Sequence, residues 1–481
     1  MAVKLRALAL SLLMCGPLAL ADGLPDLGES SQADLPPHME RRIGEGIVRD
    51  IRLRDPAYVD DPEIQAYLSQ LGNRLTAQSG DARNDFEFFA VRDNTLNAFA
   101  LPGGFIGVHT GLILAAQSES ELAGVLSHEI AHVTQRHMAR MVGKQNQAQV
   151  AQWLALAVAI LGSRSNSNIS QGALAAGMAA GIQTQLHYSR DFEREADRVG
   201  FQILENAGFD VRGMSSFFER LQKFGRLYEN NAPDYLLTHP LTTERISDMA
   251  NRAQQRPYRQ VADSLEFQLV RAKLKAESGS AADAVTSFQS QVSEKKYASA
   301  VAAYYGLARA QLRARNFAAA EKALEELRRL KVASPMVETL AGEIKEAQGD
   351  NRAALHIYRE ARPRYPRHRA LTYALVETLL ADKQMDEALK ITSAELQNHP
   401  SDQALHGLQA KAYALMGKRL QQHRALAELY ALRGQLPAAI EQLELAQKAK
   451  DGDFYELSAV DSRLRELRAR YAEEMKETKQ R

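Results

Sequence analysis

Cysteine is almost absent from this sequence of 481 residues, because the single Cys15 lies within an N-terminal apolar run. A disulfide framework is therefore excluded, and no cysteine-based metal site can form. Any metal ion must be bound by His, Asp or Glu.

An excess of charge of either sign is also missing. The chain has 60 Lys and Arg against 59 Asp and Glu, and removing a leader that contains Lys4 and Arg6 leaves 58 against 59. This balance offers no electrostatic footprint for nucleic acid, which is not expected as a partner.

The N-terminus has the pattern of a secretory signal peptide. Two basic residues precede the apolar run 7–20, and Ala19-Leu20-Ala21 places small side chains around a cleavage site. We predict cleavage after Ala21. A lipid anchor on Cys15 is the alternative, but the large Met14 before it and the very short leader disfavour it.

Long apolar spans are lacking as well. The run 148–162 is strongly apolar, but it contains Gln149 and Gln152 and is shorter than the roughly 20 residues of a membrane span. We expect a buried helix or a lid there, followed by a mobile loop over 163–181. At most peripheral contact with a membrane is expected.

Periodicity and turn residues predict a mainly α protein with two domains after the leader. The first, 22–262, opens with a tether over 22–37 and is expected to be an α+β domain with a small β-sheet. The second, 263–481, is expected to be all-α. Helices are predicted at 39–53, 62–78, 118–141 (with Ser118 and Glu121 as a capping box) and 189–206, strands at 86–91 and 105–112, and a tight connection over 94–104.

The second domain shows an internal repeat. Ala320, Ala354 and Ala388 are each 34 residues apart, and Ala439 recovers the pattern 51 residues later, after one and a half periods. A helix-turn-helix unit of this length with small residues at the helix crossing resembles the tetratricopeptide repeat. The alternative is a generic helical bundle in which the spacing of the alanines is accidental. The repeat pattern is weaker after Ala388, because Glu395 occupies a position that alanine fills in other repeats.

The strongest chemical signal is His128-Glu129-Ile130-Ala131-His132. Positions i and i+4 share one face of a helix, so both imidazoles can bind one ion. Neighbouring apolar residues place Glu129 on the buried stripe, where a carboxylate without a role would be costly. The motif predicts two zinc ligands, with Glu129 as the general base that activates water and protonates the leaving amine.

The helix expected at 189–206 carries a second acidic motif. Glu193 and Asp197 lie together at the edge of its apolar face, and Gly200 would permit close packing against the first helix. We assign Glu193 as the third ligand of the zinc ion, with the fourth position open for water. Asp197 is expected to accept a hydrogen bond from a ligand imidazole. Solvated carboxylates that pair with nearby arginines are the alternative.

These motifs, together with Asn97-Ala-Phe-Ala-Leu-Pro-Gly-Gly104, resemble the M48 family of zinc metallopeptidases. With the leader and the repeats, the chain looks most like the periplasmic β-barrel assembly-enhancing protease group of that family. The resemblance implies a zincin-like fold, one Zn²⁺ per chain and endopeptidase activity in the periplasm. It also implies a chaperone-like role in outer-membrane quality control.

The resemblance further implies unfolded or misassembled outer-membrane proteins as substrates, and the β-barrel assembly machinery as a partner of the repeats. A repeat-based scaffold with latent or secondary protease activity is the alternative. An edge strand near 105–110 is expected to hold the substrate extended. Four tyrosines would line a groove in the repeats, or else belong to their core: Tyr304, Tyr358, Tyr373 and Tyr413.

His239 and Arg245 follow in a loop and the next helix. Either both stabilise the oxyanion, or His239 takes the fourth zinc position and keeps the enzyme latent. A capping or solvated His239 is the third alternative. His137 is expected at the surface, because it is too far along the helix to join the zinc pair, and His109 is expected near the cleft without an assigned role.

Overall fold

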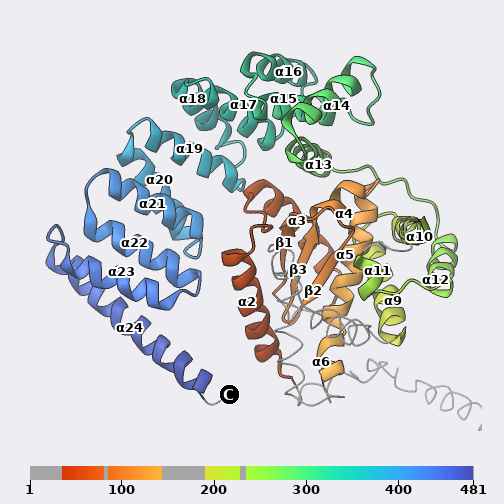
Figure 1. The fold of residues 1–481 in the computed structure, drawn as a ribbon, viewed down its shortest axis with the longest axis horizontal. Coiled ribbons are helices and arrows are strands. Elements are labelled where there is room, and N and C mark those ends of the chain that lie inside the picture. Colours follow the sequence, from red (N-terminus) through yellow and green to blue (C-terminus); the bar gives the residue numbers. More distant parts are fainter. Residues whose placement is uncertain (1–34, 81–84, 143–189, 228–233, 480–481) are drawn as a thin grey trace, which may run out of the picture.

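The computed structural model describes residues 35–80, 85–142, 190–227 and 234–479 (Figure 1). The predicted leader with its cleavage site, most of the predicted tether, the apolar run 148–162 and the loop expected after it lie outside these residues. Within the described ranges, no helix is both long and apolar enough to cross a membrane.

A three-stranded sheet forms the centre of the first region. It consists of β1 (Glu87–Val91), β2 (Ala98–Leu101) and β3 (Phe105–His109), in the order β1-β3-β2. β3 is parallel to β1 and antiparallel to β2, so β3 is the middle strand. The expectation of an edge strand at 105–110 is therefore wrong, and the described edge on that side of the sheet is β2.

The segment 94–104 was expected to be only a tight connection, but it contains β2. Gly103 and Gly104 make the tight turn from β2 into β3, with φ of 77° and 92°. A Cβ atom on Gly103 would lie 2.4 Å from the Cα of Arg41, so the turn also needs glycine for space. The strand expected at 105–112 ends at His109, because Thr110 begins a short helix.

Helices surround this sheet, and those expected at 39–53, 62–78 and 189–206 are present with slightly shifted ends. The helix expected at 118–141 is interrupted at Arg136, whose φ is 52°. The Ser118 hydroxyl accepts a hydrogen bond from the Glu121 amide at 3.3 Å, as the capping box predicts. The helices are α2 (Pro37–Arg54), α3 (Pro62–Thr76), α4 (Thr110–Ala115), α5 (Glu119–Thr134), α6 (His137–Val142), α9 (Arg190–Asn206), α10 (Arg212–Leu227), α11 (Asp234–Thr238) and α12 (Thr243–Gln254).

The second region is an all-α repeat array, as predicted. The second helices of three successive pairs begin at Phe317, Asn351 and Met385, which are 34 residues apart. The repeating alanines of the predicted pattern are all fully buried. The array comprises α13 (Leu265–Glu277), α14 (Ala281–Ser293), α15 (Ala300–Arg313), α16 (Phe317–Arg329), α17 (Pro335–Ala347), α18 (Asn351–Ala361), α19 (Arg369–Ala381), α20 (Met385–Asn398), α21 (Gln403–Leu415), α22 (Arg419–Leu432), α23 (Leu436–Lys448) and α24 (Phe454–Lys479).

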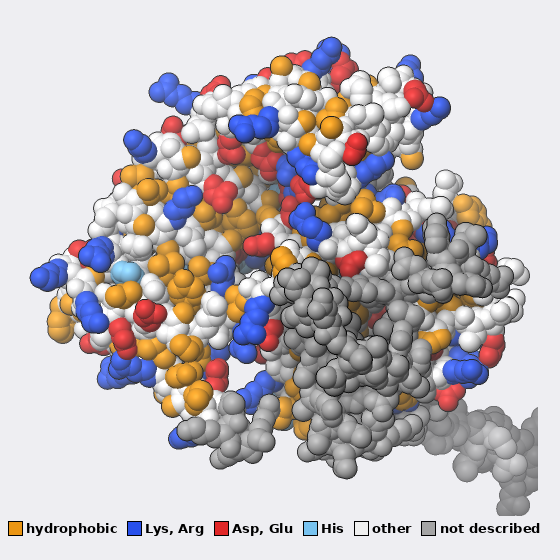
Figure 2. Space-filling model, in the orientation of Figure 1, with side chains coloured by type: hydrophobic (Ala, Val, Ile, Leu, Met, Phe, Trp, Pro, Cys, Tyr) orange, Lys and Arg blue, Asp and Glu red, His pale blue; other side chains and the backbone are white. Residues whose placement is uncertain are grey.

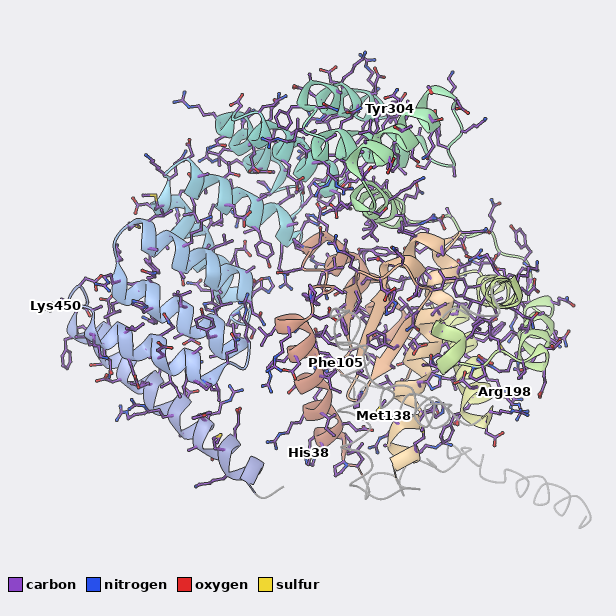
Figure 3. The ribbon with its side chains drawn as sticks, in the orientation of Figure 1. His38, Phe105, Met138, Arg198, Tyr304 and Lys450 are labelled. Carbon is purple, nitrogen blue, oxygen red and sulfur yellow. The ribbon has the colours of Figure 1, made fainter. Side chains whose placement is uncertain are left out.

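The four tyrosines proposed for a groove do not share one environment. Tyr358 is fully buried in the core of the repeats, which contradicts its place in a groove. Tyr373 is half-buried and donates a hydrogen bond to Asp402 at 2.6 Å, while Tyr304 and Tyr413 are half-buried (Tyr304 is labelled in Figure 3).

The repeat array curves around the first region and contacts it at several places, two of which lie far apart along the array (Figure 1). At one, Lys273 of α13 is buried and lies 2.7 Å from Glu63 Oε2 and 2.5 Å from Asp61 Oδ2. At the other, the turn at Gly434 lies against the side chain of Arg49 in α2. The two regions are therefore joined by packing as well as by the chain.

The surface carries charges of both signs. On the described part of the face in Figure 2, acidic and basic side chains are interspersed, and neither sign covers a large area. This distribution agrees with the near-neutral net charge of the chain.

Replacing Lys273 with Met is expected to destabilise the junction by about 3–5 kcal/mol, because Glu63 would stay buried without its counter-ion. Burial raises the pKa of Glu63, but Lys273 and His368 together outweigh burial and lower it to about 2, below its ordinary value of 4.5. The pair therefore contributes fully above pH 4.5, and its contribution is lost as the pH falls toward 2. Urea unfolding at pH 7 measures the cost. Lys296→Met, at an exposed position, is the control. Equal stability of both variants would contradict the stabilising role of the Lys273–Glu63 pair at the junction.

Candidate metal centre

The catalytic-type motif lies on α5, which passes through the core of the first region. His128, Glu129 and His132 are all buried. α9 packs directly against α5 at Gly200, where an added Cβ would lie 3.0 Å from the amide nitrogen of His128. The close packing expected at this glycine is present, and it brings the acidic motif of α9 to the two histidines.

Four ligand-type side chains meet between these helices. His128 Nε2 lies 3.0 Å from His132 Nε2, and His132 Nε2 lies 3.4 Å from Glu193 Oε1. His239, just after α11, places its Nδ1 3.0 Å from Glu193 Oε1 and 3.4 Å from His128 Nε2. These four groups all lie within 4.8 Å of one another and are buried.

This spacing fits a zinc ion. Tetrahedral ligands at about 2.0–2.1 Å from zinc lie about 3.4 Å from one another, and the four atoms here are 3.0–3.4 Å apart along these contacts. The donor set of three imidazoles and one carboxylate is also a set that zinc takes. The structure thus brings together His128, His132 and Glu193, the three ligands assigned from sequence, with His239, for which the fourth position was one of the alternatives.

A carboxylate and an arginine contact the residues of this group on the side away from the cluster. Asp197 Oδ1 lies 3.1 Å from His128 Nδ1, on the side of the ring away from the cluster. Arg245 donates to both oxygens of Asp197, at 2.7 and 2.8 Å, and its Nη1 lies 2.8 Å from Glu193 Oε2. The sequence suggested Arg245 for the oxyanion, whereas its guanidinium is engaged with these two carboxylates.

Burial and neighbouring charges shift the acid–base properties of the cluster. Burial lowers the pKa of His128, but its hydrogen bonds with Asp197 and Glu193 outweigh burial and raise it to about 9. Burial lowers the pKa of His132 well below 6.5. Burial raises the pKa of Glu193, yet the facing His239 and His128 bring it well below its ordinary value, so Glu193 is ionised.

Glu129 stands apart from the ligand group. Burial raises the pKa of its carboxyl, and the main chain of Ala100 in β2 opposes this more weakly. Among the described residues, its Oε1 has no hydrogen-bond partner, and the imidazole Nε2 of His239 lies 3.5 Å from it. A buried carboxyl with a raised pKa and a free oxygen is suited to accept and release a proton.

Two residues near the cluster differ from expectation or were missed. His137, expected at the surface, is fully buried and places Nδ1 2.9 Å from His132 Nδ1. The sequence pattern missed Tyr235, whose buried ring lies 4.6 Å from that of His239, centroid to centroid. His109, expected near the cleft, is buried at the end of β3 with its Nδ1 2.8 Å from Thr95 Oγ1.

Comparisons with known proteins match both regions. The model of Peptidase family M48 matches residues 62–253, and two tetratricopeptide repeat models match 269–335 and 346–412. The beta-barrel assembly-enhancing protease of Escherichia coli K12 is 32% identical over 93% of this chain and 92% of its own length. A Vibrio cholerae relative is 41% identical over 63% of each chain. The mitochondrial metalloendopeptidase OMA1 of Schizosaccharomyces pombe is 32% identical over 37% of this chain and 50% of its own.

Zinc binding is expected to release about one proton at pH 7, because His128 must lose the proton that its raised pKa retains. Below pH 9, deprotonation of His128 should make the affinity for zinc rise about tenfold per pH unit. Well above pH 9, zinc binding should no longer release a proton from His128. Titration calorimetry in two buffers of different ionisation enthalpy measures the release. Heats that are independent of the buffer at pH 7 would contradict the protonated His128.

Proposed function

This chain belongs to peptidase family M48 and is a metalloendopeptidase with C-terminal tetratricopeptide repeats; from this we propose that it is a zinc-dependent protease of the periplasm that removes misfolded or misassembled outer-membrane proteins. The observation that carries the proposal is the buried group of His128, His132, Glu193 and His239, with Glu129 beside it.

In this proposal His128, His132 and Glu193 hold the zinc ion. Zinc, when bound, supplies a Lewis acid that polarises the scissile carbonyl and makes water more acidic. Glu129 takes the proton from the attacking water and delivers it to the leaving amine, for which its raised pKa is suited. Asp197 orients His128 through the 3.1 Å contact, and Arg245 holds Asp197 and Glu193 in place.

Substrate is proposed to bind along β2. Within the described residues β2 pairs only with β3, and its Ala100 lies against Glu129. An extended substrate segment that pairs with the free edge of β2 would place its main-chain carbonyl groups close to the general base Glu129. Main-chain pairing is independent of sequence, which favours unfolded clients over compact ones.

The repeat domain is proposed to begin at residue 263 and to recruit partners. Ser264 caps α13, and both its amide and its hydroxyl donate to Glu119 at the start of α5, at 2.9 and 2.7 Å. The name of the Escherichia coli relative points to β-barrel assembly, so the proposed partner of the repeats is the outer-membrane assembly machinery.

The second candidate is a repeat-based scaffold whose protease is latent. One observation favours it: His239 Nδ1 lies within the ligand group, and a fourth protein ligand there would exclude the water that catalysis requires. Expression of Glu129→Gln in cells that lack the protein separates the two functions. Retained assembly of outer-membrane proteins would support the scaffold, and its loss would support the protease.

The Glu129→Gln variant is expected to bind one zinc ion per chain but to cleave casein at least about 10²-fold more slowly, because the general base is lost. Metal analysis and casein cleavage by the purified mature protein measure both effects. Glu205→Gln is the matched control, since Glu205 lies on α9 and pairs with Arg256 at the surface. Cleavage by Glu129→Gln at the wild-type rate, or a wild-type protein without zinc, would refute the proposal.

His239→Ala distinguishes the two proposed roles of that residue. If His239 fills the fourth coordination position of zinc, the variant at saturating zinc should cleave casein faster than wild type, because water can then bind at that position. If His239 stabilises the oxyanion, kcat should fall about 10²-fold or more. The exposed His356→Ala serves as the control. We expect the faster variant, and a slower one would rule out latency through His239.

A further inference from the structure

We propose that His137 is a positioning residue for the ligand His132, through the hydrogen-bonded chain His132–His137–Glu195. The inference rests on the proposed zinc site. The two imidazoles face one another with their Nδ1 atoms 2.9 Å apart, and His137 Nε2 lies 3.1 Å from Glu195 Oε2. His137 is completely buried, and its contact with His132 is buried as well.

The chain of contacts permits one assignment of protons that leaves His132 able to bind metal. If Nε2 of His132 is the ligand atom, its Nδ1 carries the hydrogen and donates it to His137 Nδ1. A neutral histidine has one donor and one acceptor nitrogen, so His137 then carries its hydrogen on Nε2 and donates it to Glu195. In the opposite assignment His132 would carry hydrogen on Nε2 and could not bind the ion. By accepting the hydrogen bond from His137, the Glu195 carboxylate therefore selects the ligand tautomer of His132.

Several contacts hold His137 in this orientation. Its ring stacks on that of Phe192 with the centroids 4.6 Å apart and the planes 12° from parallel. Arg140 of α6 donates to Glu195 Oε2 at 2.8 Å and lies over the same Phe192 ring. These contacts tie α6 to α9, the helices on which Figure 3 labels Met138 and Arg198.

The two histidine ligands thus have parallel supports. His128 contacts Asp197, which Arg245 clamps, and His132 contacts Glu195 through an inserted imidazole. Each support ends on a carboxylate of α9 that is held by an arginine. Partners of ligand histidines typically contribute 10–100-fold to metal affinity. The same contribution is expected of His137.

The test measures the zinc dissociation constant of full-length variants by competition with a chelator. His137→Leu keeps an apolar side chain against Phe192 but lacks the acceptor, and should bind zinc about 10–100-fold more weakly. His137→Asn places an amide oxygen near the lost Nδ1 and should recover most of the affinity. Glu205→Gln, on the same helix as Glu195, should bind as wild type. The zinc-free forms should unfold at similar urea concentrations.

The outcomes are separable. If wild type binds zinc and His137→Leu binds it equally tightly, the positioning role is overturned. If wild type itself binds no zinc, the proposed function fails first. Should His137→Leu not fold, Glu195→Ala replaces it, because Glu195 is about one-third exposed at its side chain. Unchanged zinc affinity in Glu195→Ala would likewise overturn the proposal, and a loss of affinity would support it.

Discussion

The close approach of α5 and α9 at Gly200 is the constraint on which the site depends. A Cβ atom at position 200 would lie 3.0 Å from the amide nitrogen of His128, closer than an ordinary contact, so the absence of a side chain favours this close approach of the helices. At this separation a carboxylate from one helix and two imidazoles from the other converge within hydrogen-bonding distance. Both helices also bury their apolar faces in the same core, which fixes the approach energetically.

Convergence of so many polar groups in a buried place requires compensation. Arg245 opposes burial and lowers the pKa of Asp197, the facing His239 and His128 do the same for Glu193, and Glu195 is paired with Arg140 nearer the surface. Removing one member of such a pair leaves a buried charge, whereas the complete group is stable. The same rule applies to Lys273 and Glu63, which are 210 residues apart in sequence and join the repeats to the first region.

Local patterns in the sequence were sufficient for the parts of the site that lie on single helices. His128 and His132 share a face of one helix with Glu129 beside them on its buried stripe, Glu193 and Asp197 share a face of the other, and the structure brings the two helices together. The position of His239 and the true contacts of Arg245 depend on how α11 and α12 pack, which no local period encodes. His137 was misplaced because the left-handed Arg136 interrupts the helix and turns the next residue inward. β2 was missed because four residues beside two glycines resemble a loop.

The central claim is that the buried group of three imidazoles and one carboxylate is a single zinc centre. Diffraction from crystals of the zinc-loaded mature protein, recorded on both sides of the zinc absorption edge, tests it most directly. We expect one anomalous peak per chain, about 2.0–2.1 Å from His128 Nε2, His132 Nε2, a Glu193 oxygen and His239 Nδ1. A peak elsewhere, or none between α5 and α9, would contradict it.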